Sequence, residues 1–400
     1  MIKTTIIQII REIFFLLVMP IDLLTPKKNN YWMFATHPGY PWCDSIRSVF
    51  EHTLEDKRIT PILLVNDRML KEQLSLIYQN DECVIVKRYS FRGIIYYLRS
   101  KVIFISYTNK DLYSMLLPHV RHVIVNLWHG IPIKTIALAQ PKHRDLQRKV
   151  LNPFYNQCSY LISSSDIDRL AMSSSMMHNF NNVWVTGLPR NDCLVQSQVP
   201  RSDVQKDEEN LLAVLGKRKL LLYAPTFREW LDNENPISNP SNLNALIAIA
   251  KEHGFVLGLR AHPLDDSLAF NYHDDLLYCG NKIFSNPQTV LKHTSILITD
   301  YSSIWTDFLL TERPIVGFVY DHERYVTERA MLYDLNLVFP GQLNVTFEDL
   351  TQDLVKRMNS EGYDAEKYEF ARDIFFKYSD AKSTKRVVSK VIEHIGLPSQ

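Results

Sequence analysis

Two histidines stand directly after short apolar runs, where a strand would end. His129 and Gly130 follow Val123–Leu127, and His262 follows Phe255–Leu259 with a proline behind it. Glycine permits a tight turn and proline ends a strand, so both imidazoles are expected at the rim of a site. An imidazole can take up a proton near neutral pH, which makes both histidines candidate catalytic residues. The alternative is that each is an ordinary packed or surface histidine.

A second group of polar residues suits an anionic ligand. Its members follow two further apolar runs, around Leu220–Tyr223 and Ile296–Ile298, and are Thr226, Arg228, Asp300, Ser302 and Ser303. A helix with an apolar face is predicted to begin at Ile304. Its free backbone N–H groups would suit a phosphate. The alternative is that Ser302 or Ser303 only caps this helix.

The apolar runs themselves predict the elements that position these residues. Runs of about four to six apolar residues without alternation are typical of parallel strands buried on both faces. The predicted strands are Tyr31–Ala35, Ile62–Val65, Cys83–Val86, Val102–Ser106, Val123–Leu127, Tyr160–Ile162 and Val183–Val185, then Leu220–Tyr223, Phe255–Leu259, Ile296–Ile298 and Ile315–Val319. Helix-period segments such as Leu243–His253 and Ile304–Leu310 lie between many of them. The pattern predicts an α/β fold with two Rossmann-like doubly wound domains facing across a cleft.

The polar stretch Gln196–Asn210 separates the two series of strands and is the predicted domain boundary. Residues 26–195 would form the N-terminal domain and residues 211–400 the C-terminal one, ending in one or two helices between Tyr363 and Ile395. No GxGxxG follows the first strand, so the sequence gives no support to a dinucleotide-dependent redox enzyme.

Residues 1–25 are predicted to form an amphipathic helix in the membrane interface. Their longest uninterrupted apolar run, Ile13–Met19, is far shorter than the roughly 20 residues that a spanning helix needs. The alternative is a buried helix that packs on the first domain.

Composition narrows the kinds of partner, metal site and cellular compartment to be expected. The 400 residues carry a formal net charge of +1, which gives no general reason to expect nucleic acid as a partner. The five cysteines are scattered and odd in number, so neither a disulfide framework nor a zinc site is expected, and a reducing cytosol is the natural compartment.

Six segments occur in the order known from one enzyme family. They are NLWHGIPIK (Asn126–Lys134), YLISSSD (Tyr160–Asp166), GLPRND (Gly187–Asp192), LLYAPTFRE (Leu221–Glu229), RAHP (Arg260–Pro263) and ITDYSSIWTDFLLTERPIVGFVYD (Ile298–Asp321). Over about half its length, from residue 120 to 335, the chain resembles the CDP-glycerol glycerophosphotransferase family of teichoic-acid and capsule-forming enzymes. The first hundred residues are only loosely similar.

The resemblance implies a GT-B architecture, with an acceptor-side N-terminal domain and a C-terminal domain that binds the CDP donor. It places Gly130, Arg190 and Asn191 on the acceptor side, although Arg190 alone would read as a solvated residue in a simple turn. It further implies CDP-glycerol or CDP-ribitol as substrate, no cofactor and no metal. The expected location is peripheral, on the cytoplasmic face of the cell membrane, with a lipid-linked or polymeric glycan as acceptor.

Two residues depart from the family pattern. Ile131 stands where a threonine usually follows the WHG motif, and Ala330 stands where a glycine usually follows Arg329. Both bear on how donor and acceptor are held more than on the class of reaction.

The expected reaction is attack by an acceptor hydroxyl on the phosphorus that carries the polyol, with CMP leaving. His129 is the candidate base, or it orients the acceptor while a carboxylate takes the proton. His262, Arg228 and Arg329 would stabilise charge on the leaving group. Two other functions stay open: a GT-B enzyme that uses a nucleotide-sugar, and a non-catalytic phosphoglycan-binding protein at the membrane.

Overall fold

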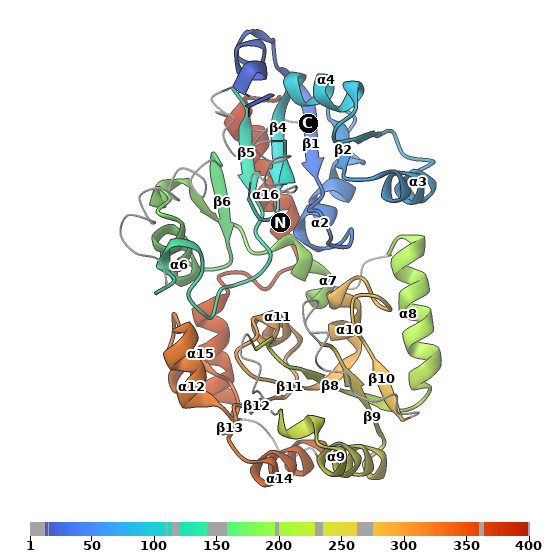
Figure 1. Cartoon of the computed structure of the whole chain (residues 1–400), viewed down its shortest axis with the longest axis vertical. Helices are drawn as coiled ribbons and strands as arrows, with labels where there is room; N and C mark the ends of the chain where they lie inside the picture. The colour runs from blue at the N-terminus through green and yellow to red at the C-terminus, as the bar shows by residue number, and fades with distance from the viewer. Residues whose placement is uncertain are drawn as a thin grey trace. The chain divides into compact units, whose positions relative to one another are not determined.

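The chain divides into two compact units. The structure is a computed structural model, which describes residues 13–14, 16–108, 111–113, 121–141, 158–196, 200–228, 235–261, 275–359 and 364–398. Unit 1 comprises Met1–His129, Ala137–Asp192 and Asp380–Gln400, and unit 2 comprises Gly130–Ile136 and Cys193–Ser379. Figure 1 shows the helices and strands of each unit.

Unit 1 is built on a parallel sheet with the strand order β3-β2-β1-β4-β5-β6-β7. Its strands are β1 (Lys28–Ala35), β2 (Thr60–Val65), β3 (Val84–Lys87), β4 (Ser100–Ile105), β5 (Val123–Asn126), β6 (Tyr160–Ser163) and β7 (Val183–Val185). Met33 at its centre pairs with Ile62 on one side and Ile103 on the other. The direction in which strands are added reverses between β1 and β4, which is the topological switch point of this sheet.

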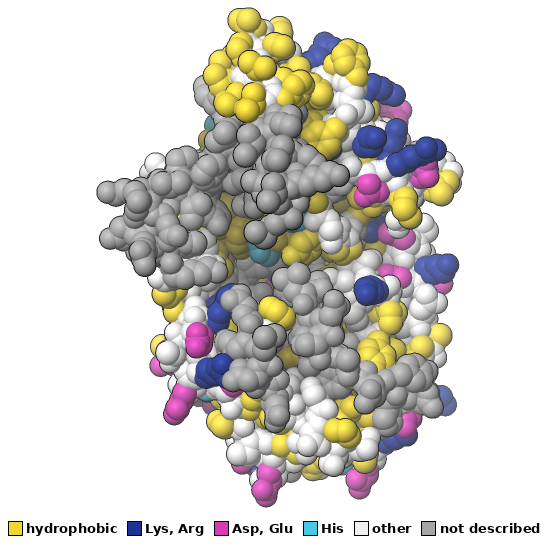
Figure 2. All heavy atoms as spheres, viewed as in Figure 1, with side chains coloured by type: hydrophobic (Ala, Val, Ile, Leu, Met, Phe, Trp, Pro, Cys, Tyr) yellow, Lys and Arg dark blue, Asp and Glu magenta, His cyan; other side chains and the backbone are white. Residues whose placement is uncertain are grey.

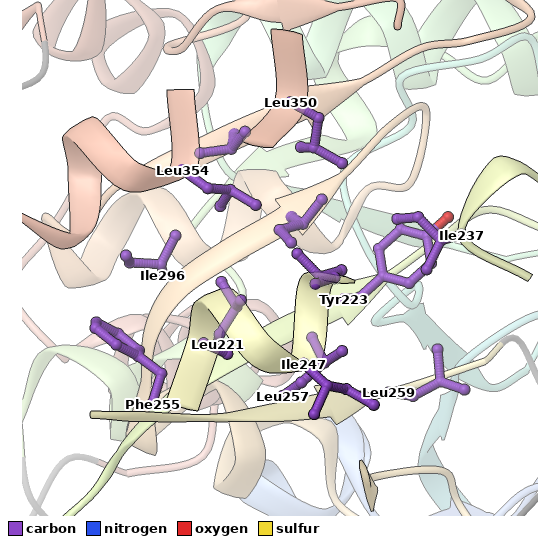
Figure 3. Close-up of a cluster of buried hydrophobic side chains, with 14 of the residues drawn as sticks. Leu221, Tyr223, Ile237, Ile247, Phe255, Leu257, Leu259, Ile296, Leu350 and Leu354 are labelled. Carbon is purple, nitrogen blue, oxygen red and sulfur yellow. The ribbon is translucent and has the colours of Figure 1, made fainter. Parts of the chain in front are cut away.

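Unit 2 repeats the same topology with the strand order β10-β9-β8-β11-β12-β13. Its strands are β8 (Lys219–Ala224), β9 (Phe255–Leu259), β10 (Leu276–Tyr278), β11 (Thr294–Thr299), β12 (Ile315–Phe318) and β13 (Leu343–Asn344). Here the switch point lies between β8 and β11. Figure 3 shows apolar side chains of this unit, including Leu221, Leu257 and Ile296 from three strands, packed together with Leu350 and Leu354 of a covering helix.

Most of the helices occupy the connections between strands, as the pattern predicts, and the last three follow the final strand. Those of unit 1 are α2 (Asp44–Thr53), α3 (Arg68–Ile77), α4 (Phe91–Arg99), α6 (Asp166–Met176) and α16 (Ser383–Ile395), with α7 (Asp192–Val195) at the junction of the units. Those of unit 2 are α8 (Ser202–Leu215), α9 (Pro240–Glu252), α10 (Pro287–His293), α11 (Ile304–Phe308), α12 (His322–Arg329), α13 (Leu335–Val338), α14 (Phe347–Met358) and α15 (Ala365–Phe375). Short 3-10 turns are η2 (Ala137–Ala139), η3 (Phe180–Asn182), η4 (Pro189–Asn191), η5 (Pro236–Ser238) and η6 (Leu309–Thr311).

The predicted fold class is therefore confirmed, since every predicted strand is present and both sheets are parallel. Two strands were not predicted, β10 and β13, which have three and two residues. Runs this short carry too little apolar pattern to be recognised in a sequence.

The predicted boundary stretch Gln196–Asn210 is not a linker in its second half, because α8 begins at Ser202 and belongs to unit 2. Leu211 and Leu215, four residues apart on this helix, are buried and give it a packing face. The units divide earlier, between Asp192 and Cys193.

The C-terminal helix α16 also departs from the predicted domain 211–400, since it belongs to unit 1. Asp192 explains this, because its carboxylate accepts hydrogen bonds from the backbone N–H groups of Ser383 (3.0 Å) and Thr384 (2.9 Å) at the start of α16. Arg386 of the same helix donates to the Thr186 carbonyl oxygen (2.8 Å). In Figure 1, α16 lies among the blue and green elements of unit 1.

The N-terminal segment packs on unit 1 through one face. Residues 16–24 are helical, Val18 is part of the core cluster, and the buried Asp22 pairs with Lys27 (2.5 Å) and His122 (3.0 Å). The alternative of a helix packed on the first domain is thus confirmed for this face. The other face exposes Ile13, Phe14, Leu16, Leu17, Ile21 and Leu24.

Figure 2 shows hydrophobic side chains gathered over this N-terminal segment. Within the part of the chain that the structure describes, no helix combines the length and apolar character needed to cross a membrane. Residues 1–12 and 15 of the predicted interfacial helix lie outside the described residues.

The packing of α16 against Gly187 gives a testable prediction. An alanine Cβ there would stand 2.3 Å from Ser383 Oγ, whereas Gly254 has a similar φ (+76° against +78°) and no atom within 4 Å of the added Cβ. Both alanine variants incur the cost of a positive φ, about 1–2 kcal/mol. Gly187→Ala must also move the side chain of Ser383 at the start of α16, so we expect its free energy of unfolding to fall by about 1–3 kcal/mol more than that of Gly254→Ala. Urea denaturation of the full chain measures both; equal losses would mean that α16 is not seated against Gly187.

Candidate active site

The candidate residues gather at the carboxyl ends of strands in both units. Parallel strands bring these ends to the same edge of a sheet, and ligands of doubly wound folds bind where the strand order reverses. In unit 2, Thr226 follows β8 and Asp300 follows β11, which are the two strands of the switch point. In unit 1, His129 follows β5, which pairs with β4 of the switch point.

A strained turn presents His129. Trp128 has a φ of 48° and Gly130 a φ of 145°, both in a range that side chains disfavour. Asn126 at the end of β5 stabilises the turn, because its Oδ1 accepts from the Trp128 N–H (2.9 Å) while its Nδ2 donates to the Tyr107 carbonyl oxygen (3.0 Å). This turn directs the chain away from the sheet immediately after the strand.

The environment of the His129 ring leaves one nitrogen able to accept a proton. Nδ1 lies 3.2 Å from the Ser106 carbonyl oxygen, which can only accept, so Nδ1 carries the hydrogen and Nε2 carries the lone pair. The ring stacks on Tyr107 (centroids 4.0 Å, 19° between planes). Burial lowers the pKa of His129 from 6.5 to about 4, so the imidazole is neutral near pH 7. Among the described residues, Nε2 has no hydrogen-bond partner, and a neutral imidazole with such a nitrogen is the form that a general base requires.

Arg190 stabilises this turn through a hydrogen bond to its backbone. It is buried, so it is not a solvated turn residue, and its Nη1 donates to the His129 carbonyl oxygen and lies 3.5 Å from Asp44 Oδ2. Asn191 is buried within η4 beside it. Arg190 therefore acts through the backbone of His129 in this structure, and the predicted contact of Arg190 and Asn191 with an acceptor stays a prediction.

The segment that follows His129 belongs to unit 2, although Gly130 was predicted on the acceptor side in the N-terminal domain. Lys134 pairs with Met331 in an antiparallel bridge, and the Thr135 hydroxyl donates to the Arg329 carbonyl oxygen (2.8 Å). Ile131, one of the two departures from the family pattern, is fully buried. Its side chain is therefore part of the core, not of an exposed ligand surface.

Arg228 is the centre of a buried ionic cluster in unit 2. Its Nε and Nη2 donate to the two oxygens of Asp321 (2.8 and 3.0 Å), and its Nη1 lies 2.9 Å from Asp300 Oδ2. The guanidinium also lies over the rings of Tyr301 and Tyr325, which stack on each other 3.7 Å apart. Burial alone would lower the pKa of Arg228, but the two carboxylates outweigh it and raise the pKa.

This cluster changes how the site can hold an anion. Two carboxylates compensate the single charge of Arg228, so Arg228, Asp300 and Asp321 hold one another, and the predicted contact of Arg228 and Asp300 with a phosphate stays a prediction. Asp300 Oδ1 also accepts from the Thr226 N–H (2.9 Å) and so fixes the end of β8.

Lys134 and Arg329 are two further cations near this cluster. Lys134 Nζ donates to the Tyr325 hydroxyl (3.3 Å), and Arg329 lies close enough to influence the same hydroxyl. Ala330 behind Arg329 has a φ of 53°, a conformation that favours the glycine usual in the family. The departure at Ala330 is therefore a strained residue directly beside a predicted donor ligand.

The hydroxyl groups of the site differ in their partners. Thr226 Oγ1 is buried and has no hydrogen-bond partner among the described residues. A buried hydroxyl without a partner costs free energy, which a ligand that accepts its hydrogen bond would recover. Ser302 Oγ accepts weakly from the Ile304 N–H (3.4 Å), and Ser303 at the N-cap makes no side-chain cap hydrogen bond. Helix α11 has only five residues, so its dipole is smaller than the predicted helix implied.

His262 lies outside the described residues, so its catalytic role stays a prediction. The preceding Arg260 is buried and ties the end of β9 to the turn after β10, with Nη1 donating to the Phe284 carbonyl oxygen (3.2 Å). Within the described ranges, no three His, Cys, Asp or Glu side chains are grouped so that they could hold a metal ion.

Sequence reasoning missed three residues of these sites. Asp321 comes shortly after β12, so the rule of strand ends could have found it. Tyr107 likewise follows β4. Lys134 ends the motif NLWHGIPIK, but its place in unit 2 depends on pairing with residues almost two hundred positions later, which the motif does not indicate.

The fold and these strand-end sites define a GT-B-like α/β protein. The chain belongs to the CDP-glycerol:poly(glycerophosphate) glycerophosphotransferase family, whose model matches residues 17–393. The match confirms the family resemblance seen in the sequence motifs.

Individual relatives agree with this family. The chain is 24% identical to a teichoic acid poly(ribitol-phosphate) polymerase of Bacillus spizizenii over 92% of its own length and 57% of the relative's. It is 25% identical to a teichoic acid poly(glycerol phosphate) polymerase of the same organism over 92% of its own length and 93% of the relative's. The structure of the wall teichoic acid polymerase TagF has a TM-score of 0.74 at 20% identity and covers 94% of this chain and 92% of that chain. The chain thus spans just over half the length of the ribitol-phosphate relative.

The unpartnered hydroxyl of Thr226 gives a prediction with a matched control. Thr226→Val should leave the free energy of unfolding unchanged or higher and weaken binding of the CDP-polyol by about tenfold, the value of one hydrogen bond to a charged group. Thr299→Val is the control, because its hydroxyl already donates to the Ala224 carbonyl oxygen (2.7 Å). It should lose about 1 kcal/mol of stability and keep its donor affinity. Calorimetric titration and urea denaturation measure both; unchanged donor affinity in Thr226→Val would remove Thr226 from the donor site.

The depressed pKa of His129 predicts a pH dependence of stability. Between pH 6.5 and about 4 the unfolded chain binds a proton that folded His129 does not, so stability falls as the pH is lowered through this window. His129→Gln lacks this term and should lose about 1–2 kcal/mol less than the wild type between pH 7 and pH 5. Urea denaturation at both pH values measures the difference. Equal losses would show that His129 is not desolvated in the folded chain.

Proposed function

We propose that this protein transfers glycerol phosphate, or a related polyol phosphate, from a CDP-activated donor to a hydroxyl of a cell-surface glycan, and releases CMP. Family membership supports the donor class, and relatives of this chain are named as polymerases of ribitol phosphate and of glycerol phosphate. The observation that carries the proposal is the neutral imidazole of His129, with its open Nε2 at the end of β5.

The step is a displacement at the phosphorus that carries the polyol. The acceptor oxygen forms a new bond to this phosphorus, and the bond from phosphorus to the bridging oxygen breaks. The bridging oxygen keeps the electron pair and leaves as part of CMP. His129 Nε2 takes the proton of the attacking hydroxyl, and a positioned base of this kind contributes about 10²–10⁴-fold to the rate.

Unit 2 supplies the donor site in this proposal. Lys134 and Arg329 offset the charge that develops on the leaving phosphate, while Thr226, Ser302 and Ser303 donate hydrogen bonds. The cluster of Arg228, Asp300 and Asp321 holds these groups in place. From its position in the sequence, His262 joins them as a second catalytic group.

The donor is CDP-glycerol or CDP-ribitol, used as a substrate, and the reaction uses neither a cofactor nor a bound metal. A TagF variant has been studied after soaking with CDPG. The acceptor is a lipid-linked or polymeric glycan of a teichoic acid, capsule or other cell-envelope polymer, and nucleic acid is not a partner.

The protein acts at the membrane surface, on its cytoplasmic face. The exposed apolar residues of the N-terminal segment support this, since Leu17 and Leu24 are 73% and 81% exposed. A helix that packs through one face and exposes apolar side chains on the other is suited to lie in the interface of a bilayer.

Release of CMP tests this function. Purified protein should release CMP from CDP-glycerol or CDP-ribitol only when a lipid-linked or oligosaccharide acceptor is present. His129→Ala should lower this rate about 10²–10⁴-fold and keep donor affinity, because it removes the base and not the donor site. His253→Ala, a histidine at the end of α9, is the control and should match the wild type.

Turnover by His129→Ala at the wild-type rate would show that another group takes the proton. Acceptor-dependent release of a nucleoside diphosphate from a nucleotide-sugar, with no CMP from either CDP donor, would instead establish the sugar-transferring alternative.

A further inference from the structure

Unit 1 has its own switch point between β1 and β4, and a set of polar and aromatic side chains lies there. His37 and Tyr40 follow β1, and Tyr107 and Asp111 follow β4. This is the counterpart in unit 1 of the place where Thr226 and Asp300 meet in unit 2. Of these four side chains, Tyr107 already contacts the candidate base, because its ring stacks on that of His129.

A carboxylate fixes the orientation of the His37 ring. Asp111 is fully buried, and its Oδ2 accepts from the backbone N–H groups of Ser106 and Tyr107, each at 2.9 Å. Its other oxygen contacts His37 Nδ1, which must therefore be the N–H donor. In the neutral imidazole, Nε2 of His37 then carries the lone pair, and the side chain is 20% exposed. The pair thus presents one hydrogen-bond acceptor from a rigid support.

Tyr107 links this pair to the candidate base. Its ring centroid lies 4.1 Å from that of His37 and 4.0 Å from that of His129, so the two imidazoles are no farther apart than the sum of these distances. A vicinal diol that hydrogen-bonds to both rings spans roughly 8 Å, because each hydrogen bond adds about 3 Å to the separation of the two hydroxyl oxygens. This upper limit allows two neighbouring hydroxyls each to reach one of the two rings.

Tyr40 adds a partly exposed aromatic ring to this group of side chains. It contacts both His37 and Tyr107 at 4.9 Å between ring centroids, and 39% of it is exposed. An exposed aromatic ring beside polar groups offers an apolar face to the C–H groups of a polyol or sugar.

The charged groups around these side chains balance one another. Asp44, Asp111 and Arg190 influence His129, and Arg88 is a second guanidinium that interacts with Asp111. Two carboxylates thus face two guanidiniums, and a neutral hydroxyl that donates to His37 adds no net charge to this region.

We propose that His37, Tyr40 and Tyr107 form an acceptor subsite that binds the terminal diol of the acceptor chain. One hydroxyl of the diol donates to His129 Nε2 and the neighbouring hydroxyl donates to His37 Nε2. Asp111 is the positioning residue that keeps the lone pair on Nε2. This inference rests on the proposed function for the nature of its ligand, a polyol chain end.

The test combines one side-chain change with one ligand change. His37→Asn keeps an N–H donor for Asp111 in place of Nδ1 and removes Nε2, so the tie between the ends of β1 and β4 persists. The ligands are a synthetic glycerol phosphate trimer with a terminal diol and the same trimer without the secondary hydroxyl of that diol. Calorimetric titration of the full chain without donor gives four dissociation constants, which form a double-mutant cycle.

The wild type should bind the trimer, and loss of the secondary hydroxyl should weaken binding by about tenfold. His37→Asn should bind the trimer about tenfold more weakly than the wild type, and the same ligand change should then alter its affinity by less than about threefold. His253→Asn is the matched control and should behave as the wild type. CDP-glycerol should bind all three proteins equally, which shows that the variants are folded.

The subsite is overturned if the secondary hydroxyl matters equally in the wild type and His37→Asn, or if the wild type binds neither trimer. The outcome is separate from that of the proposed function. A chain that shows the predicted coupling but never releases CMP keeps the subsite and loses the transferase, and a chain that releases CMP without the coupling does the reverse.

Discussion

Parallel strand pairing is the constraint on which both candidate sites depend. In each sheet the strands end at one edge, and the order reverses at one place, between β1 and β4 or between β8 and β11. Residues distant in sequence meet at this place in each sheet. The Asp300 carboxylate accepts a hydrogen bond from the Thr226 N–H, and the Asp111 carboxylate contacts the His37 ring. Each contact joins the ends of the two strands at which the order reverses, so the same topology organises a site in each unit.

Much of this arrangement can be predicted from the sequence. Uninterrupted apolar runs such as Leu220–Tyr223 mark buried parallel strands, and the polar residue after each run marks the edge of the sheet. The packing of an element onto a unit cannot be predicted in this way. Helix α16 joins unit 1 because Asp192 caps it, and the segment around Lys134 joins unit 2 because it pairs with Met331. Both contacts are long-range, and local periodicity carries no information about them.

The charge states and ion pairs of the sites could not be predicted from the sequence either. Sequence reasoning placed Arg228 and Asp300 near a phosphate, but it could not show that Asp321 would complete their ion pairs. Two carboxylates surround one guanidinium in this cluster, so its net charge differs from that expected of Arg228 alone. The neutral state of His129 was equally hidden, since it follows from burial and not from residue type.

The central claim is that the phosphate carrying the polyol moves from the donor to the acceptor. Following the phosphorus of this phosphate tests the claim most directly. A CDP-glycerol labelled with ³²P only in the phosphate that carries the glycerol, incubated with the protein and an acceptor, separates phosphate transfer from every other outcome. The account predicts that the label appears in the acceptor product while unlabelled CMP is released. Label that stays entirely with the nucleotide, or in free glycerol phosphate formed at the same rate without acceptor, would contradict it.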